Sequence, residues 1–284
     1  MHSPWIERLL LCLELGIGAA FAFVVSTYVV ALLLTRGGFG WPGLSYFLRE
    51  TLWVCITQSL LPFGWVSRAR VDGGASSSRG KGRRPIVLVH GYTQNRTNFV
   101  WLERHLGRRG LGPFFGFDYQ SFARIESSAH ELSAFVSRVL AATGAPEVDL
   151  VCHSLGGLVA RTYVDLLGGG GSVRRIVTLG TPHRGIAHAV LAVGASVRDM
   201  HPPTGFIARL DGAAPSAVEI HSIFSTHDNI VFPSSASTLG ARGTDVVVRQ
   251  HGHFGILFSE EVAEHVTRAL GEEVAAAREV TVVA

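Results

Sequence analysis

The feature that most constrains this chain is a serine placed between a buried strand and a helix. An apolar run at 148–151 leads into Cys152-His153-Ser154-Leu155-Gly156, and the small-residue stretch 157–160 follows. A serine on such a sharp turn needs small residues two positions before and after it, because larger side chains would collide. Gly156 meets this need, and Cys152 meets it approximately. The pattern predicts a nucleophile elbow, in which a strand-to-helix turn presents the serine hydroxyl.

A serine hydroxyl attacks well only when a neighbouring base removes its proton, and an acid orients that base. The loop Gln250-His251-Gly252-His253-Phe254-Gly255 follows an apolar strand at 246–248 and offers two histidines, of which only one can reach the serine. Asp228 lies just past an expected strand at 218–225 and is the candidate acid. Asp245, at the start of its own strand, is the weaker candidate.

Backbone N–H groups must also stabilise the charge that develops on a carbonyl oxygen under attack. The N–H of Leu155 follows the serine directly, and a His-Gly-Tyr loop after an upstream strand directs the N–H of Tyr92 toward the same oxygen. We expect these two groups to form an oxyanion hole; an ordinary strand–loop junction is the alternative for the upstream loop. His90, His153 and His183 border these loops and are expected to be packing or hydrogen-bonding residues.

Histidines and acids that lie close together in sequence raise the question of a metal site. His227, Asp228, His251 and His253 are the candidate ligands. They lack the paired ligand spacing that is typical of zinc sites, so we expect neither a metal nor another cofactor. Cys152 is expected to be a buried small residue and not a second nucleophile, since it lies at a strand end.

Four stretches of the chain carry a family resemblance. The most diagnostic is Thr178-Leu179-Gly180-Thr181-Pro182-His183-Arg184-Gly185. The others are the His-Gly-Tyr loop at His90, the elbow His153-Ser154-Leu155-Gly156-Gly157, and Asp228-Asn229-Ile230-Val231 with Gly252-His253-Phe254. Together they make the chain similar to lipases and esterases of the α/β-hydrolase superfamily, close to bacterial triacylglycerol lipases. The resemblance covers roughly residues 85–270.

The resemblance implies a role for each matching residue. Ser154 would be the nucleophile, Asp228 the orienting acid and His253 the general base and acid, in the chain order that the family uses. It also favours His253 over His251. Most members have glycine where this chain has Cys152, so we expect the turn to survive but the serine to be crowded and the activity to be lower or more selective.

Residues 85–284 are expected to form one catalytic domain, which is long enough for a substantial core. Strands and helices alternate along it, which predicts parallel strands with helices on both faces and a site at the carboxyl ends of the strands. The residues at about 185–210 are expected to form a short lid; their apolar composition suits an acyl chain, although a plain core helix has the same composition. The expected strands are 86–89, 114–117, 148–151 and 175–179, and the expected helices are 99–106, 128–142 and 158–167.

Residues 1–70 are expected to form a membrane anchor. No charged residue occurs from Leu15 to Thr35, so a transmembrane helix is expected at about 9–35. A buried helix and a cleaved signal peptide fit less well, and a membrane-associated helical cap packed on the hydrolase stays an open alternative. The segment at about 44–66 carries polar residues at helical spacing and is expected to be an amphipathic interfacial helix or a second membrane segment.

Residues 71–84 are expected to be a basic Gly/Ser linker that separates the anchor from the catalytic domain. Its cations suit contact with anionic lipid headgroups or simply a solvated tether. The net charge of +3 is mostly accounted for by this segment, and no nucleic-acid-binding motif occurs. The three cysteines do not form a disulfide framework, so they do not settle the compartment.

The sequence therefore predicts a membrane-anchored serine esterase or lipase that hydrolyses carboxylic esters, lipid esters above all, through an acyl-enzyme. A bacterial inner membrane is the expected location; a single span would place the hydrolase in the cytoplasm, and a hairpin would place it beside the N-terminus. An acyltransferase or lipid-remodelling deacylase on the same fold is the first alternative. An inactive hydrolase fold that serves as an interaction module is the second. The sequence leaves the oligomeric state open.

Overall fold

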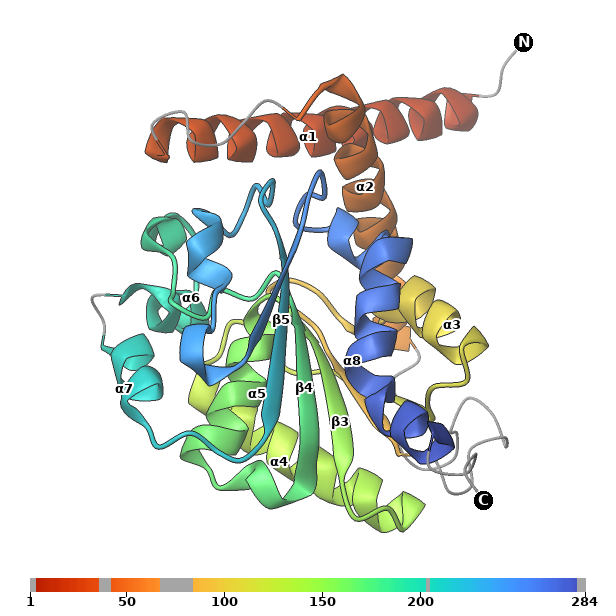
Figure 1. Cartoon of the computed structure of the whole chain (residues 1–284). Helices are drawn as coiled ribbons and strands as arrows, with labels where there is room; N and C mark the ends of the chain where they lie inside the picture. The colour runs from red at the N-terminus through yellow and green to blue at the C-terminus, as the bar shows by residue number, and fades with distance from the viewer. Residues whose placement is uncertain (1–3, 36–41, 67–83, 203–204, 280–284) are drawn as a thin grey trace.

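A six-stranded parallel sheet forms the centre of the protein (Figure 1). The computed structural model describes residues 4–35, 42–66, 84–202 and 205–279. The strand order is β2-β1-β3-β4-β5-β6, and every neighbouring pair is parallel, so all carboxyl ends meet at one edge. The strands are β1 Ile86–Val89, β2 Phe114–Phe117, β3 Val148–His153, β4 Val173–Leu179, β5 Glu219–Ser225 and β6 Thr244–Val248.

Helices cover both faces of the sheet. In β1, Val87 and Val89 join the core under α4 and α5, whereas Ile86 and Leu88 join the core under α3 and α8, as the two-residue period of a strand requires. The predicted α/β architecture is confirmed. The helices of the domain are α3 Val100–Arg108, α4 Ile125–Thr143, α5 Leu155–Leu166, α6 Ala195–Met200, α7 Phe206–Gly212 and α8 Glu260–Glu279. Short 3₁₀ turns are η1 Arg96–Phe99, η2 Gly169–Ser172, η3 Ala187–Leu191, η5 Ser234–Ser237, η6 Gly240–Arg242 and η7 Gly255–Phe258.

The elements around the serine are longer than the sequence predicts. β3 continues to His153 and α5 begins at Leu155, so Ser154 alone separates strand from helix. The expected helix at 158–167 starts three residues earlier because glycines 156 and 157 allow close contact with β1 and with the loop after β4. The turn is therefore as tight as a strand-to-helix connection can be.

Two N-terminal helices, α1 Pro4–Leu34 and α2 Leu44–Val66, complete the structure. α1 runs across the carboxyl end of the sheet, and α2 descends from it beside α3 and α8 (Figure 1). The Asn95 side chain donates to the carbonyl of Leu61 at 2.9 Å, and the Thr97 hydroxyl donates to the carbonyl of Leu60 at 3.2 Å. The expected linker at 71–84 lies, apart from its last residue, outside the described residues. α2 packs directly on the α/β domain.

Many large apolar side chains of these two helices are exposed, alongside the polar side chains of Arg49 and Gln58 on α2. Glu50 and Thr57, which the sequence pattern assigns to the polar side of an amphipathic helix, are buried against the rest of the protein. The outward-facing large side chains are Leu11, Leu15, Ile17, Phe21, Phe23, Val29, Leu32, Leu33 and Leu34 on α1, and Leu44, Leu48, Leu52 and Phe63 on α2. Of the polar residues that predict an amphipathic helix at 44–66, Arg49 and Gln58 are exposed, whereas Glu50 and Thr57 are buried.

Within α1, the stretch Glu14–Leu34 is long and apolar enough to cross a membrane. The core helix of a soluble protein or a signal sequence can also be this long and this apolar. Only 17% of the hydrophobic window of this stretch is buried, whereas a core helix is mostly buried.

Candidate active site

Ser154 sits on a strained turn at the carboxyl end of β3. Its φ of 52° and ψ of −123° lie in a region that residues other than glycine rarely occupy. The turn is held by a hydrogen bond from the Ser154 N–H to the carbonyl of Leu179, at 2.9 Å. Gly156 is required there, because a Cβ at that position would overlap the carbonyls of Val89 and His90. The strain is thus sustained by two neighbouring strands, and it aims the hydroxyl away from the sheet.

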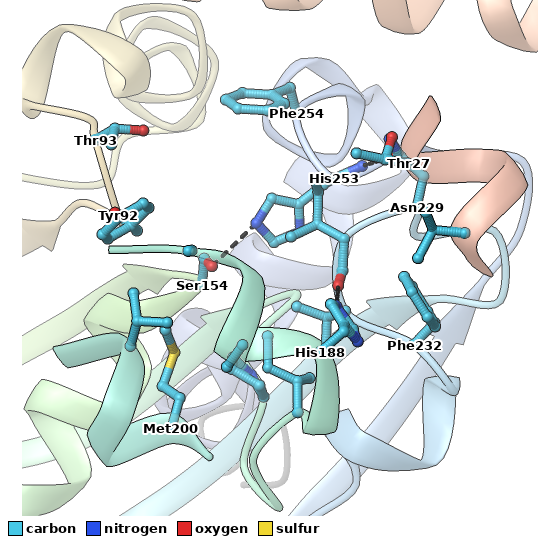
Figure 2. Close-up of a pocket in the computed structure, with 18 of the residues that line it drawn as sticks. Thr27, Tyr92, Thr93, Ser154, His188, Met200, Asn229, Phe232, His253 and Phe254 are labelled. Atoms are coloured by element: carbon cyan, nitrogen blue, oxygen red, sulfur yellow. Dashed lines mark hydrogen bonds between the residues drawn. The ribbon is translucent and has the colours of Figure 1, made fainter. Parts of the chain in front are cut away.

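His253 lies in the loop after β6 and faces the serine (Figure 2). Its Nε2 is 3.0 Å from Ser154 Oγ, and its Nδ1 is 2.8 Å from Asp228 Oδ2. A carboxylate can only accept, so Nδ1–H donates to Asp228 and Nε2 is left to accept from the serine hydroxyl. The structure brings together the three side chains that the sequence selects from separate stretches.

Asp228 is fixed by the turn that follows β5. Its Oδ1 accepts hydrogen bonds from the N–H groups of Ile230 and Val231, at 2.8 and 2.7 Å, which leaves Oδ2 for the histidine. Gly180 borders the pair with a φ of 58°, and a Cβ there would contact Asp228 Oδ2 and the His253 ring. Asp228 and His253 are buried, so water competes little for the hydrogen bond between them.

The rival residues lie elsewhere. His251 Nε2 is 3.3 Å from Glu261 and 3.2 Å from Ser259, away from the serine. Asp245 accepts from the N–H groups of Leu239 and Gly240 in a different loop. In the part of the chain that the structure describes, no group of three or more histidine, cysteine or acidic side chains is arranged to hold a metal ion.

The histidines beside the motifs are buried and neutral. His183 contacts the Thr178 hydroxyl at 2.9 Å, and burial holds the pKa of its imidazole well below the ordinary value. His153 lies between Gln94 and the carbonyl of His253, and burial lowers its pKa in the same way. These residues support the loops around the serine. Cys152 is fully buried in the core under α4 and α5, and burial raises the pKa of its thiol, so it is an inert packing residue.

Comparison with known proteins identifies the type of fold. A family model described as lipase (class 2) matches residues 83–209. A triacylglycerol lipase of Pseudarthrobacter phenanthrenivorans is 39% identical over 113 residues, 36% of this chain and 34% of the relative. A triacylglycerol lipase of Burkholderia plantarii is also 39% identical over 113 residues, 36% of this chain and 30% of the relative. The chain thus spans about a third of the length of the curated relatives it matches.

Solved structures extend the comparison to about two thirds of the chain. Mature Bacillus licheniformis lipase BlEst2 matches with a TM-score of 0.56 at 18% identity, covering 67% of this chain and 93% of that one. Aspergillus fumigatus lipase B matches with a TM-score of 0.60 at 20% identity, covering 69% and 55%. Phospholipase PlaB from Legionella pneumophila matches with a TM-score of 0.58 at 15% identity, covering 67% and 60%. The chain has the α/β-hydrolase fold. In sequence it is similar to lipases.

The two residues whose N–H groups are expected at the oxyanion are Leu155, which follows Ser154, and Tyr92, which lines the same pocket as Ser154. Leu155 is the first residue of α5, where helix geometry leaves the N–H without an intrahelical acceptor. Tyr92 lines the pocket beside Ser154, and its hydroxyl donates to the carbonyl of Val193 at 2.6 Å. The Gly91 N–H, one residue earlier, is already bonded to Gln94.

A pocket of about 350 Å³ opens onto Ser154 and His253. One wall comes from the predicted lid region, with Ile186, Ala189 and Met200. Residues 229–232 after β5 also line the pocket. A further part of the lining comes from α1, which the sequence does not place near the site, with Phe23, Ser26, Thr27 and Val30. The walls are mostly apolar, so the pocket leaves room for an apolar group beside Ser154.

Sequence reasoning missed two residues that hold the catalytic loops. Asn229 accepts from the N–H of His253 at 3.1 Å and donates to the Thr27 hydroxyl at 2.6 Å. Glu50 accepts from the N–H groups of Phe254 and Gly255. Asn229 adjoins the acid in the motif at 228–231, which is a usable signal. Glu50 is signalled only by being a lone acid in an apolar helix.

Proposed function

We propose that the protein is a serine carboxylic-ester hydrolase that acts on lipid esters through an acyl-enzyme. The observation that carries the proposal is the hydrogen-bonded series from Ser154 Oγ to His253 Nε2 and from His253 Nδ1 to Asp228, with distances of 3.0 and 2.8 Å. A hydroxyl so placed beside an imidazole is an activated nucleophile. The similarity to lipases and esterases supports the same reaction class.

In the proposed reaction, His253 Nε2 takes the proton of Ser154 as Oγ attacks the ester carbonyl carbon. The negative charge moves to the carbonyl oxygen, where the N–H groups of Tyr92 and Leu155 stabilise it. Asp228 stabilises the imidazolium that forms. His253 then gives its proton to the departing alcohol, which leaves an acyl group on Ser154. Water repeats the sequence and releases the acid.

The pocket supports a substrate with an acyl chain. Its apolar walls come from residues 186–200 and from α1, and they converge on the serine. A hydrocarbon chain gains about 0.8 kcal/mol for each CH₂ group that it buries. Polar groups in the wall are mostly engaged; His188, for example, donates to the carbonyl of Ile230 at 2.7 Å. Triacylglycerol lipases among the relatives act, by their names, on such esters.

We further propose that α1 and α2 bind the surface of a bilayer, with α1 lying in the membrane plane. Val24, Tyr28 and Ala31, in the carboxyl-terminal half of α1, are buried against neighbouring parts of the protein. A bilayer that enclosed the full length of α1 would therefore have to enclose the loops of the active site as well. An in-plane helix avoids this and leaves its outer apolar side in the acyl region.

Labelling with a fluorophosphonate probe tests the proposal. The full-length protein in detergent is expected to label on one serine, and Ser154→Ala is expected to abolish both labelling and hydrolysis of p-nitrophenyl butyrate while the far-UV circular dichroism spectrum stays unchanged. Loss of the nucleophile in serine hydrolases lowers kcat by roughly 10⁴- to 10⁶-fold. Undiminished turnover by Ser154→Ala would reject the assignment.

A further inference from the structure

The loop that carries His253 is held from outside the hydrolase domain. We propose that Glu50 of α2 is a positioning residue for His253, so that the N-terminal helices are a component of the active site as well as a membrane contact. This inference rests on the proposed function of His253 as the base. It assigns to the N-terminal segment a role that an anchor on a flexible linker does not have.

The two carboxylate oxygens of Glu50 bind successive N–H groups of this loop. Oε1 accepts from the N–H of Phe254 at 2.7 Å, and Oε2 accepts from the N–H of Gly255 at 2.9 Å. These are the two peptide groups that directly follow His253. A carboxylate that accepts two backbone hydrogen bonds makes strong, charge-assisted contacts. The backbone on the carboxyl side of the base is therefore fixed by a residue of α2.

Two glycines make room for the carboxylate. A Cβ at Gly252 would overlap the carboxyl group of Glu50, and a Cβ at Gly255 would lie 2.8 Å from Glu50 Oε2. At both positions the Cβ would lie closer to the Glu50 carboxyl group than real Cβ atoms lie to their neighbours. The glycines on either side of His253 thus form a notch that the Glu50 side chain fills. This gives a physical reason for the Gly-His-Phe-Gly sequence beyond the flexibility of a loop.

Neighbouring side chains of α2 contact the same loop. One turn beyond Glu50, Trp53 stacks on Phe258 with ring centroids 4.2 Å apart and parallel planes. Arg49 donates to the carbonyl of Gln250 at 3.2 Å. Three residues of one helix therefore contact residues 250–258, Arg49 before the position of the base and Glu50 and Trp53 after it.

Burying a carboxylate between two segments costs free energy, so we expect the hydrogen-bond geometry of the Glu50 carboxylate to have a role. Glu50 is 2% exposed, and desolvation is the largest influence on its ionisation. An apolar side chain would pack α2 on the domain without that cost but would leave the N–H groups of Phe254 and Gly255 unpaired. The arrangement therefore fixes the loop backbone in a defined position. A misplacement of about 1 Å in such a site costs on the order of 100-fold in rate.

Kinetics of substituted proteins test the inference. In full-length protein with p-nitrophenyl butyrate, Glu50→Ala is expected to lower kcat by about 10- to 100-fold with KM changed less than about twofold. Glu50→Gln retains one acceptor oxygen and is expected to recover part of the loss. Gln58→Ala, on the exposed side of the same helix, is the matched control and is expected to keep the wild-type kcat.

A double-mutant cycle separates positioning from a general loss of stability. If Glu50 acts through the imidazole, Glu50→Ala is expected to cause no further loss in the residual activity of His253→Ala, measured well below the melting temperature of each variant. Equal losses in both backgrounds would overturn the inference, as would wild-type kcat in Glu50→Ala. If Glu50→Ala does not fold, the cycle is run with Glu50→Gln. Wild-type turnover by Ser154→Ala would instead refute the proposed function itself.

Discussion

The backbone N–H of His253 donates to the side-chain oxygen of Asn229, at 3.1 Å. The candidate base is therefore joined to the loop of the candidate acid by a second hydrogen bond, independent of the one between imidazole and carboxylate. The Tyr46 hydroxyl contacts the same oxygen at 3.2 Å, and the Asn229 amide donates to Thr27. One side chain thus links two catalytic loops to both N-terminal helices.

The first prediction concerns this link. Asn229→Ala is expected to lower kcat on a dissolved ester by about tenfold, because the His253 N–H loses its acceptor and the loops lose a shared contact, while the Tyr46 hydroxyl keeps the carbonyl of His227 as its acceptor. Steady-state kinetics on full-length protein in detergent measure the effect. Ser137→Ala serves as the control, since this exposed hydroxyl on α4 is bonded only within its own helix, to the carbonyl of Ser133. Unchanged kcat in Asn229→Ala would show that the link is dispensable.

The second prediction concerns pH. Burial raises the pKa of Glu50 from its ordinary value of 4.5 to about 7, against the opposing influence of the hydrogen bonds from Phe254 and Gly255. The nearby charge of Asp228 raises the pKa further, and that of His253 lowers it. Below pH 4.5 the group is protonated in the folded and unfolded states and contributes no pH dependence.

Between about pH 4.5 and 7 the unfolded chain releases this proton before the folded protein does. The unfolded state then binds fewer protons, so the free energy of unfolding falls as pH rises, by roughly 3 kcal/mol in total. Urea unfolding of wild type and Glu50→Gln at pH 5, 6, 7 and 8 measures this. We expect the stability difference between the two proteins to shift in favour of Glu50→Gln with rising pH. A constant difference would mean that Glu50 titrates normally.

The third prediction concerns the acyl pocket. Val30 of α1 lines the pocket, whereas its neighbour Val29 is 43% exposed and lies outside it. Val30→Trp is expected to lower kcat/KM for a dodecanoyl ester relative to a butanoyl ester by on the order of tenfold, because the larger ring occupies space that a long chain needs. Val29→Trp is the matched control and is expected to leave the ratio unchanged. If the ratio of kcat/KM for the two esters is the same in both variants, α1 does not line the substrate pocket.

The fourth prediction concerns the bilayer. Leu44, Leu48 and Leu52 are exposed at a four-residue spacing, which forms one stripe on α2. Leu48→Glu with Leu52→Glu is expected to reduce partition into phosphatidylcholine vesicles by at least about tenfold, since each buried leucine contributes roughly 1.5 to 3 kcal/mol. Turnover of a dissolved short ester is expected to persist. Val100→Glu, an exposed apolar position on α3, is the control; an equal loss there would mean that net charge alone governs partition.

Local sequence predicted the strands and the candidate catalytic residues because each has a short-range signature. The apolar run before Ser154 and the small residues after it define a turn between strand and helix. The carboxyl ends of parallel strands then bring Asp228 and His253 to the same edge as the serine. The choice of His253 over His251 came from family resemblance, and its geometry comes from a loop whose course the sequence pattern does not define.

The alternating pattern of the hydrolase, the residues at the ends of its strands and the apolar character of the first helix can all be read from the sequence. The folded structure was needed to show that this helix forms a wall of the pocket and that Glu50 holds the loop of His253. The reason is that periodicity reports which side of a helix is apolar but not what covers it. The hydrogen bond from Phe254 to Glu50 joins residues 204 positions apart, and a contact at that separation leaves no pattern along the chain.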